Sequence, residues 1–119
     1  MDDDGMVMEQ LEKKSSKSIL TRNLSILFQI SKNPTGRTLK LERRERMIEL
    51  ANQYDVLLVE DNPYGAIRFA GEALPPVKHF DTEGRVIYIS TFSKIFFTPG
   101  LRLGWICADE SFIEKVRCF

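Results

Sequence analysis

The feature of this sequence that most limits its possible folds is an amphipathic helix with a short apolar segment on either side. Over residues 41–54 the apolar side chains recur at helical spacing, and most charged ones fall on the opposite face. The apolar face is expected to consist of Met47, Leu50, Ala51 and Tyr54. Residues 25–30 (SILFQI) and 56–60 (VLLVE) are typical of buried strands, and the second is too apolar to have one face in water. This pattern favours parallel strands joined through a helix.

Two further apolar segments extend the pattern along the chain. Residues 85–90 (RVIYIS) predict a third strand, and residues 101–107 (LRLGWIC) predict a fourth. Asp109 is expected to cap a last helix over residues 110–119. The predicted fold class is therefore α/β, with a mainly parallel sheet and flanking helices, in residues 25–119. Residues 1–24 combine charges with serines and are consistent with either a frayed helix or a linker.

The charge balance and the cysteine content argue against several classes of function. Seventeen basic residues match seventeen acidic ones, so no basic excess is present to bind nucleic acid. No polybasic tract suits a membrane surface, and the apolar runs are far shorter than the ~18 residues of a membrane span. Two cysteines, Cys107 and Cys118, do not make a disulfide framework, which favours a reducing, cytoplasmic setting. We therefore expect neither nucleic acid nor a membrane among the partners.

Polar side chains follow each of the first three predicted strands. They are Asn33 after the first strand, Asp61 and Tyr64 after the second, and Thr91, Ser93 and Lys94 after the third. Arg102 follows one short loop later. Ligands of open α/β sheets bind outside the carboxyl ends of the strands. If the three strands are neighbours, these side chains are expected to converge on one crevice.

Lys94 has the most unusual setting of these candidates, because it lies between apolar residues in FSKIFF (92–97). Such a lysine either extends its amine to water from the surface or is placed there for its amine. An amine beside apolar groups and a second cation is a better nucleophile, and it forms a Schiff base with a carbonyl substrate or with pyridoxal phosphate. Taken singly, the other candidates are also consistent with ordinary turn, cap or surface residues. Their order and their placement at strand ends favour one shared site.

Three strings in the sequence resemble the cofactor-binding core of the fold-type I pyridoxal phosphate aminotransferases of class I/II. They are NPTG (33–36), EDNPYG (60–65) and TFSKIFFTPGLRLGW (91–105). The sequence around them is most similar to the branch that contains 2-aminoadipate, aromatic and multi-substrate aminotransferases. The resemblance implies an enzyme that moves an amino group from an amino acid to a 2-oxo acid, with pyridoxal 5'-phosphate as cofactor. It identifies residues 25–119 as a partial cofactor-binding large domain.

The resemblance also implies roles for the residues expected around the cofactor ring. Lys94 would hold the cofactor as a Schiff base and, once substrate displaces it, would move a proton at the substrate Cα. Asp61 would pair with the protonated ring nitrogen. Tyr64 and Asn33 would hydrogen-bond the phenolate oxygen.

The phosphate of the cofactor would be held by Thr91, Ser93 and Arg102, with Arg102 as the charged clamp. The Pro99–Gly100 pair would let the loop turn so that Arg102 returns to the site. Eight positions separate Lys94 from Arg102, which is one more than expected for this branch. The extra residue weakens the assignment of Arg102 to the phosphate.

Several parts of such an enzyme have no match in this sequence. Neither the upstream phosphate loop and stacking aromatic residue nor the downstream arginine for the substrate carboxylate is recognisable. We therefore expect a fragment that is marginally stable or self-associating and has little transaminase activity by itself. The parent protein is expected to be a homodimer. Two alternatives remain: the effector-sensing, aminotransferase-like domain of a MocR-type transcription regulator, and a non-catalytic remnant.

Overall fold

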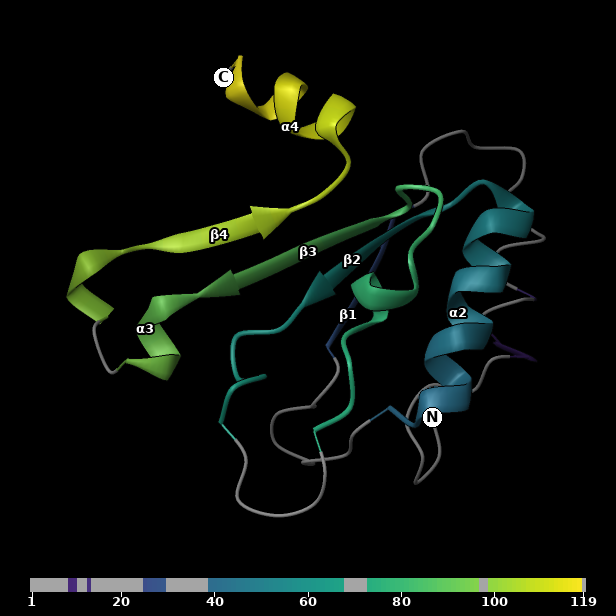
Figure 1. The fold of residues 1–119 in the computed structure, drawn as a ribbon, viewed down its shortest axis with the longest axis horizontal. Helices are drawn as coiled ribbons and strands as arrows, with labels where there is room; N and C mark the ends of the chain where they lie inside the picture. The colour runs from purple at the N-terminus through teal and green to yellow at the C-terminus, as the bar shows by residue number, and fades with distance from the viewer. Residues whose placement is uncertain are drawn as a thin grey trace.

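The computed structural model describes residues 9–10, 13, 25–29, 39–67, 73–96 and 99–118. Within these residues the chain forms a four-stranded sheet in the order β1-β2-β3-β4 (Figure 1). The strands are β1 Ser25–Gln29, β2 Leu57–Asp61, β3 Val86–Thr91 and β4 Gly104–Cys107. The first three strands run parallel, whereas β4 runs antiparallel to β3. The prediction of an α/β fold with a mainly parallel sheet is confirmed.

The register of the sheet brings the carboxyl ends of the parallel strands to one edge. Asp61, the last residue of β2, is paired with Gln29 of β1 and with Ile89 of β3. At the same edge, Thr91 of β3 is paired with Gly104, the first residue of β4. The predicted strands are therefore neighbours, which was the condition for their following loops to meet.

Helix α2 Leu41–Tyr54 has the bounds that the apolar spacing predicts. Met47, Leu50 and Ala51 are buried as expected, and Tyr54 is half-buried against the core. The helix ends at Asp55, whose φ of 53° is left-handed and whose N–H donates to the Ala51 and Asn52 carbonyl oxygens. This αL residue stops the helix and directs the chain into β2.

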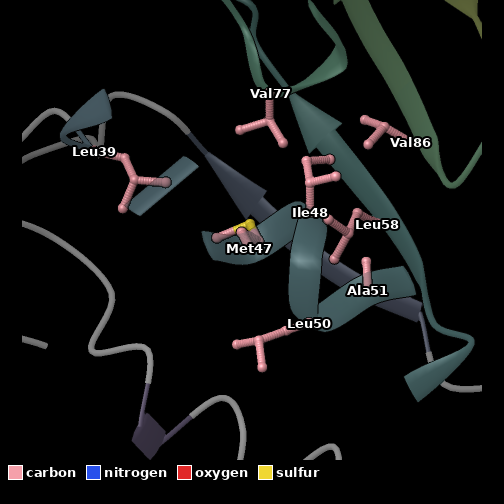
Figure 2. Close-up of a cluster of buried hydrophobic side chains, with 8 residues drawn as sticks. All are labelled: Leu39, Met47, Ile48, Leu50, Ala51, Leu58, Val77 and Val86. Carbon is pink, nitrogen blue, oxygen red and sulfur yellow. The ribbon is translucent and has the colours of Figure 1, made fainter. Parts of the chain in front are cut away.

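The core lies between α2 and one face of the sheet. Figure 2 shows Ile48 and Ala51 of α2 next to Leu58 of β2, and Val86 of β3 belongs to the same buried cluster. A short 3-10 helix, η1 Val77–Phe80, adds Val77, which is fully buried. The buried apolar cluster consists of Leu39, Met47, Ile48, Leu50, Ala51, Leu58, Val77 and Val86. Each large side chain in it stabilises the fold by about 1.5–3 kcal/mol relative to exposure.

The remaining elements follow β3 and β4. Helix α3 Phe92–Ile95 and the 3-10 helix η2 Pro99–Leu101 lie at one end of β4, and α4 Glu110–Arg117 lies at its other end (Figure 1). Asp109 caps α4 as predicted, because its carboxylate accepts a hydrogen bond from Ser111 N at 3.0 Å. The fourth strand begins at residue 104 rather than 101, because the chain first passes through η2 and Arg102 has a φ of 50°. No helix of the described segments is long and apolar enough to cross a bilayer.

Candidate functional site

Asp61 lies at the point where the parallel strands end together. Side chains alternate along a strand, so Asp61 projects from the sheet face opposite that of Glu60. Glu60 is fully buried on the α2 side, whereas Asp61 is half-buried. The carboxylate of Asp61 is thus presented at the edge where the sequence predicts a ligand.

Tyr64 lies in the turn that immediately follows β2. Its carbonyl oxygen accepts a hydrogen bond from Ile67 N at 2.9 Å, and the residue is half-buried. The turn depends on Gly65, because a Cβ at this position would lie 2.3 Å from Asn62 Nδ2. The close approach leaves no room for a side chain at position 65, so the turn that carries Tyr64 depends on glycine there.

Thr91 connects β3 to α3. Its hydroxyl oxygen accepts a hydrogen bond from Ser93 N at 3.1 Å and donates one to the Leu103 carbonyl oxygen at 2.9 Å. Thr91 is two residues beyond Ile89, the partner of Asp61, so alternation places Thr91 on the same sheet face as Asp61. Thr91 therefore joins the loop after β3 to the segment that returns after η2.

Lys94 is exposed in the third position of α3. Its neighbours Phe92 and Phe96 have exposed fractions of 37% and 61%, and the Phe92 ring lies 4.7 Å from the Trp105 ring between centroids. Apolar groups are present near Lys94, as the sequence predicts, but the described residues leave its side chain open to water.

Arg102 is exposed and has a left-handed backbone with φ of 50°. The residue after it, Leu103, accepts hydrogen bonds through its carbonyl oxygen from Phe92 N at 3.1 Å and from Thr91 Oγ1. These bonds bring the chain back to the start of α3 after η2. Arg102 is held in an unfavourable region of φ and ψ by this closure.

The structure therefore brings two of the three predicted loops to one edge of the sheet. The loop after β2 is bonded to β3 through Asn62 N, which donates to the Ile89 carbonyl oxygen at 3.0 Å. The loop after β3 carries Thr91, Ser93 and Lys94. Asn33 and the rest of the NPTG turn lie outside the described residues.

Two buried charged residues were not expected from the sequence. Glu60 is fully buried, and its carboxylate accepts hydrogen bonds from Val77 N at 3.0 Å and Lys78 N at 2.9 Å. Burial raises the pKa of Glu60, and it outweighs the two hydrogen bonds and the nearby Arg44 and Lys78 cations. The available signal was its alternation with Leu58 along β2, which places both on the core face.

Arg44 is the second of these residues, and its side chain is fully buried beside the core. Its Nε donates to the Leu39 carbonyl oxygen at 2.8 Å, and its Nη1 donates to that of Pro75. Arg44 therefore links the start of α2 to the segment before η1. Its position three residues before Met47 was the sequence signal for burial.

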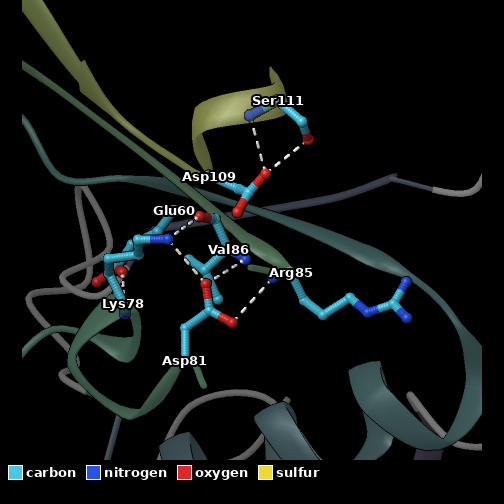
Figure 3. Close-up of polar contacts among 7 residues, drawn as sticks. All are labelled: Glu60, Lys78, Asp81, Arg85, Val86, Asp109 and Ser111. Atoms are coloured by element: carbon cyan, nitrogen blue, oxygen red, sulfur yellow. Dashed lines mark hydrogen bonds and ion pairs between the residues drawn. The ribbon is translucent and has the colours of Figure 1, made fainter. Parts of the chain in front are cut away.

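Asp81 organises the turn between η1 and β3, as Figure 3 shows. Its carboxylate accepts hydrogen bonds from Lys78 Nζ at 2.8 Å, Arg85 N at 2.8 Å and Val86 N at 2.9 Å. Burial alone would raise the pKa of Asp81, but these hydrogen bonds outweigh it and hold the pKa below its ordinary value. This turn fixes the start of β3 and so the position of its carboxyl end.

The donor set at the strand ends suits an organic anion with a polar ring. Within the described parts of the chain, no three His, Cys, Asp or Glu side chains gather to hold a metal. The residues at and just after these strand ends instead include a carboxylate, a phenol, hydroxyls, an amine and a guanidinium. These groups match the ring nitrogen, phenolate, aldehyde and phosphate of pyridoxal phosphate in chemistry.

The sequence and the fold of this chain are similar to those of known aminotransferases. The family model described as aminotransferase class I and II matches residues 2–119. An aromatic-amino-acid aminotransferase of Thermococcus litoralis is 47% identical over 98% of this chain and 28% of its own length. A crystal structure of the kynurenine aminotransferase of Pyrococcus horikoshii superposes with a TM-score of 0.84 at 41% identity, covering 97% of this chain and 29% of that one.

A transcription regulator is also similar to part of the chain. The HTH-type regulator YisV of Bacillus subtilis is 37% identical over 71% of this chain and 17% of its own length. The match is shorter and less similar than that to the Thermococcus protein. The chain spans less than a third of the length of the curated relatives described here.

Proposed function

We propose, since the chain belongs to the class I and II aminotransferases, that it carries part of a pyridoxal phosphate site for moving an amino group from an amino acid to a 2-oxo acid. The observation that carries the proposal is the joining of the two strand-end loops. Asp61 is paired with Ile89, two residues before Thr91, and Thr91 is bonded to the residue after Arg102. This pairing and this hydrogen bond support one shared site for the charged and polar groups of these loops.

Each residue of this edge has a role that follows from its chemistry. The carboxylate of Asp61 stabilises a protonated ring nitrogen, and the phenol of Tyr64 donates to an adjacent oxygen, as would the carboxamide of Asn33. Ser93 and Arg102 would bind the phosphate directly. Thr91 would join them if its hydroxyl turned away from the Leu103 carbonyl oxygen, to which it donates in the structure. The guanidinium of Arg102 supplies the positive charge, and the hydroxyls supply orientation.

Lys94 would have two roles in the site. Its amine would hold the cofactor at its aldehyde carbon, with loss of water, and once the amine of the substrate takes that place, the free lysine amine would move a proton at the substrate Cα. When bound, pyridoxal phosphate supplies an electron sink for the carbanion at that carbon. An exposed lysine on a short helix can approach both positions without rearrangement of the sheet.

Borohydride reduction in the presence of pyridoxal phosphate tests the assignment of Lys94. Mass spectrometry of the reduced chain is expected to show the added cofactor at Lys94, and Lys94→Ala is expected to lose it. Lys115→Ala removes another exposed lysine, on α4, and serves as the matched control. Equal labelling of wild type and Lys94→Ala would overturn the assignment.

We further propose that these 119 residues alone do not catalyse transamination. The support is that they cover 28% of the length of the Thermococcus aromatic-amino-acid aminotransferase, together with the exposed apolar side chains Phe96, Leu101 and Leu103 in the segments around Lys94 and Arg102. A chain of family length would cover them, as a homodimer. Turnover of an amino acid and a 2-oxo acid by the 119-residue chain would refute the proposed lack of transamination. A monomeric mass for the longer protein would refute the proposed homodimer.

A cytoplasmic setting and the absence of nucleic acid and membrane partners complete the proposal. The support is that Cys107 and Cys118 are exposed free thiols, which persist in a reducing compartment. The regulator-like alternative rests on the match to YisV. It predicts a helix-turn-helix segment encoded in the same reading frame, which sequencing of the flanking DNA would reveal.

A further inference from the structure

Asn62 lies between the two β2-loop residues of the candidate site, Asp61 and Tyr64, and is fastened to β3 by three hydrogen bonds. Its backbone N–H donates to the Ile89 carbonyl oxygen at 3.0 Å, and its Nδ2 donates to Tyr88 Oη at 3.3 Å. Its own carbonyl oxygen accepts from Ser90 Oγ at 2.8 Å. The loop after β2 is therefore attached to the strand that leads directly to Thr91.

The Ser90 side chain makes the hydrogen bond that sets the direction of the chain after Asn62. It is 8% exposed, and its β4 neighbour in the register is Trp105. Its acceptor is the carbonyl of the peptide bond that precedes Pro63, whose ring fixes φ and whose nitrogen has no hydrogen to donate. The orientation of that peptide plane sets the course of the chain toward Tyr64.

Asn62 also has a close neighbour within its own turn. The Asn62 carboxamide lies against Gly65, where a Cβ would approach its Cγ to 2.7 Å. Asn62 is therefore confined by Gly65 and bonded to the hydroxyls of Tyr88 and Ser90. A residue fixed in this way transmits the position of β3 to both of its site neighbours.

We propose that Ser90 is a positioning residue, which holds Asn62 so that Asp61 and Tyr64 keep their placement relative to Thr91 and Lys94. This inference rests on the proposed function, because it concerns the same cofactor site. Ser90 itself projects from the sheet face opposite that of Thr91, so it acts on the site through Asn62 rather than by contact with the cofactor.

The test compares Ser90→Ala with Ser90→Thr, which restores a hydroxyl, and with Ser111→Ala on the exposed side of α4 as control. Without cofactor, amide hydrogen exchange over residues 61–65 is expected to quicken about fivefold in Ser90→Ala, while α2 is unchanged. With pyridoxal phosphate, the concentration that half-saturates borohydride trapping at Lys94 is expected to rise about fivefold. Ser90→Thr and Ser111→Ala are expected to match wild type in both measurements.

Three results would overturn the inference. Exchange at residues 61–65 that is the same in Ser90→Ala and wild type would show that the hydroxyl does not hold the loop. Faster exchange throughout α2 as well, with a lower urea midpoint, would show a general effect on stability. Exchange in Ser90→Thr that is as fast as in Ser90→Ala would show that the hydroxyl is not what holds the loop. If wild type traps no cofactor, the proposed function fails, whereas the exchange measurements still decide the role of Ser90.

Discussion

Replacing Glu60 with glutamine is expected to lower the free energy of unfolding by about 2 kcal/mol at neutral pH. The carboxylate of Glu60 accepts one hydrogen bond on each oxygen, from the backbone N–H groups of Val77 and Lys78. A glutamine has one acceptor oxygen, so its NH₂ group would face the second N–H, and a buried donor would lose its partner. Losing one hydrogen bond to a charged, fully buried acceptor costs about 1.5–3 kcal/mol.

The dependence of folding stability on pH provides a second, independent test of this prediction. Burial raises the pKa of Glu60 above its ordinary 4.5, so the folded state binds the proton more tightly than the unfolded state. The stability linked to that proton is fully present below pH 4.5 and is lost as the pH rises through the folded pKa. Glutamine does not titrate, so the Glu60→Gln variant does not lose this stability. The free energy by which wild type exceeds the variant is therefore expected to decrease as the pH rises from 4.5 through the folded pKa of Glu60.

Urea unfolding followed by circular dichroism across a pH series measures both effects. Asp81 does not obscure them. Because its pKa is lowered, the stability that it contributes is fully present above pH 3.8 and is lost only as the pH falls below that value. Glu49→Gln alters an exposed carboxylate on α2 and is expected to leave the urea midpoint unchanged. Equal urea midpoints of wild type and Glu60→Gln at neutral pH would refute the reasoning, as would a wild-type stability that does not fall above pH 4.5.

Three further substitutions test the packing, the cap and the turn. Met47→Ala removes a fully buried side chain and is expected to cost about 2–5 kcal/mol in urea unfolding, and a smaller loss than 1 kcal/mol would contradict the packing described. Asp109→Ala removes the acceptor for Ser111 N and should quicken amide exchange in the first turn of α4 about fivefold, leaving α2 unaffected. Gly65→Ala forces a Cβ against the Asn62 side chain and should lower stability by about 1–3 kcal/mol, whereas an unchanged midpoint would show that Asn62 moves freely.

Local periodicity was sufficient to predict the helix and the succession of four strands along the chain, but not that the strands would be neighbours in the sheet. Helix α2 has the predicted bounds because its apolar spacing and its αL stop at Asp55 are both encoded within a few residues. The start of β4 was misplaced by three residues, because Arg102 is held out of the strand by bonds from Thr91 and Phe92 to Leu103. Such contacts between distant segments leave no periodic signal.

The candidate site also has features that the local pattern predicts and features that only contacts between segments determine. Strand-end placement predicted that Asp61 and Thr91 would share an edge, since parallel strands present their carboxyl ends together. It did not predict the burial of Glu60 or the attachment of Asn62 to Ser90. A charged or small polar residue is assigned to the surface by type, and only its partner on another segment shows otherwise.

The left-handed backbone of Arg102 means that selection for stability and selection for cofactor binding should favour different residues at position 102. At a φ of 50° an arginine is less favourable by about 1 kcal/mol or more than a residue that tolerates this region, such as glycine or asparagine. A library of variants sorted only for resistance to proteolysis should therefore drift toward those residues at position 102. The same library sorted for retention of pyridoxal phosphate should keep the arginine, so sequencing the two pools would distinguish what the chain needs to fold from what it needs to bind.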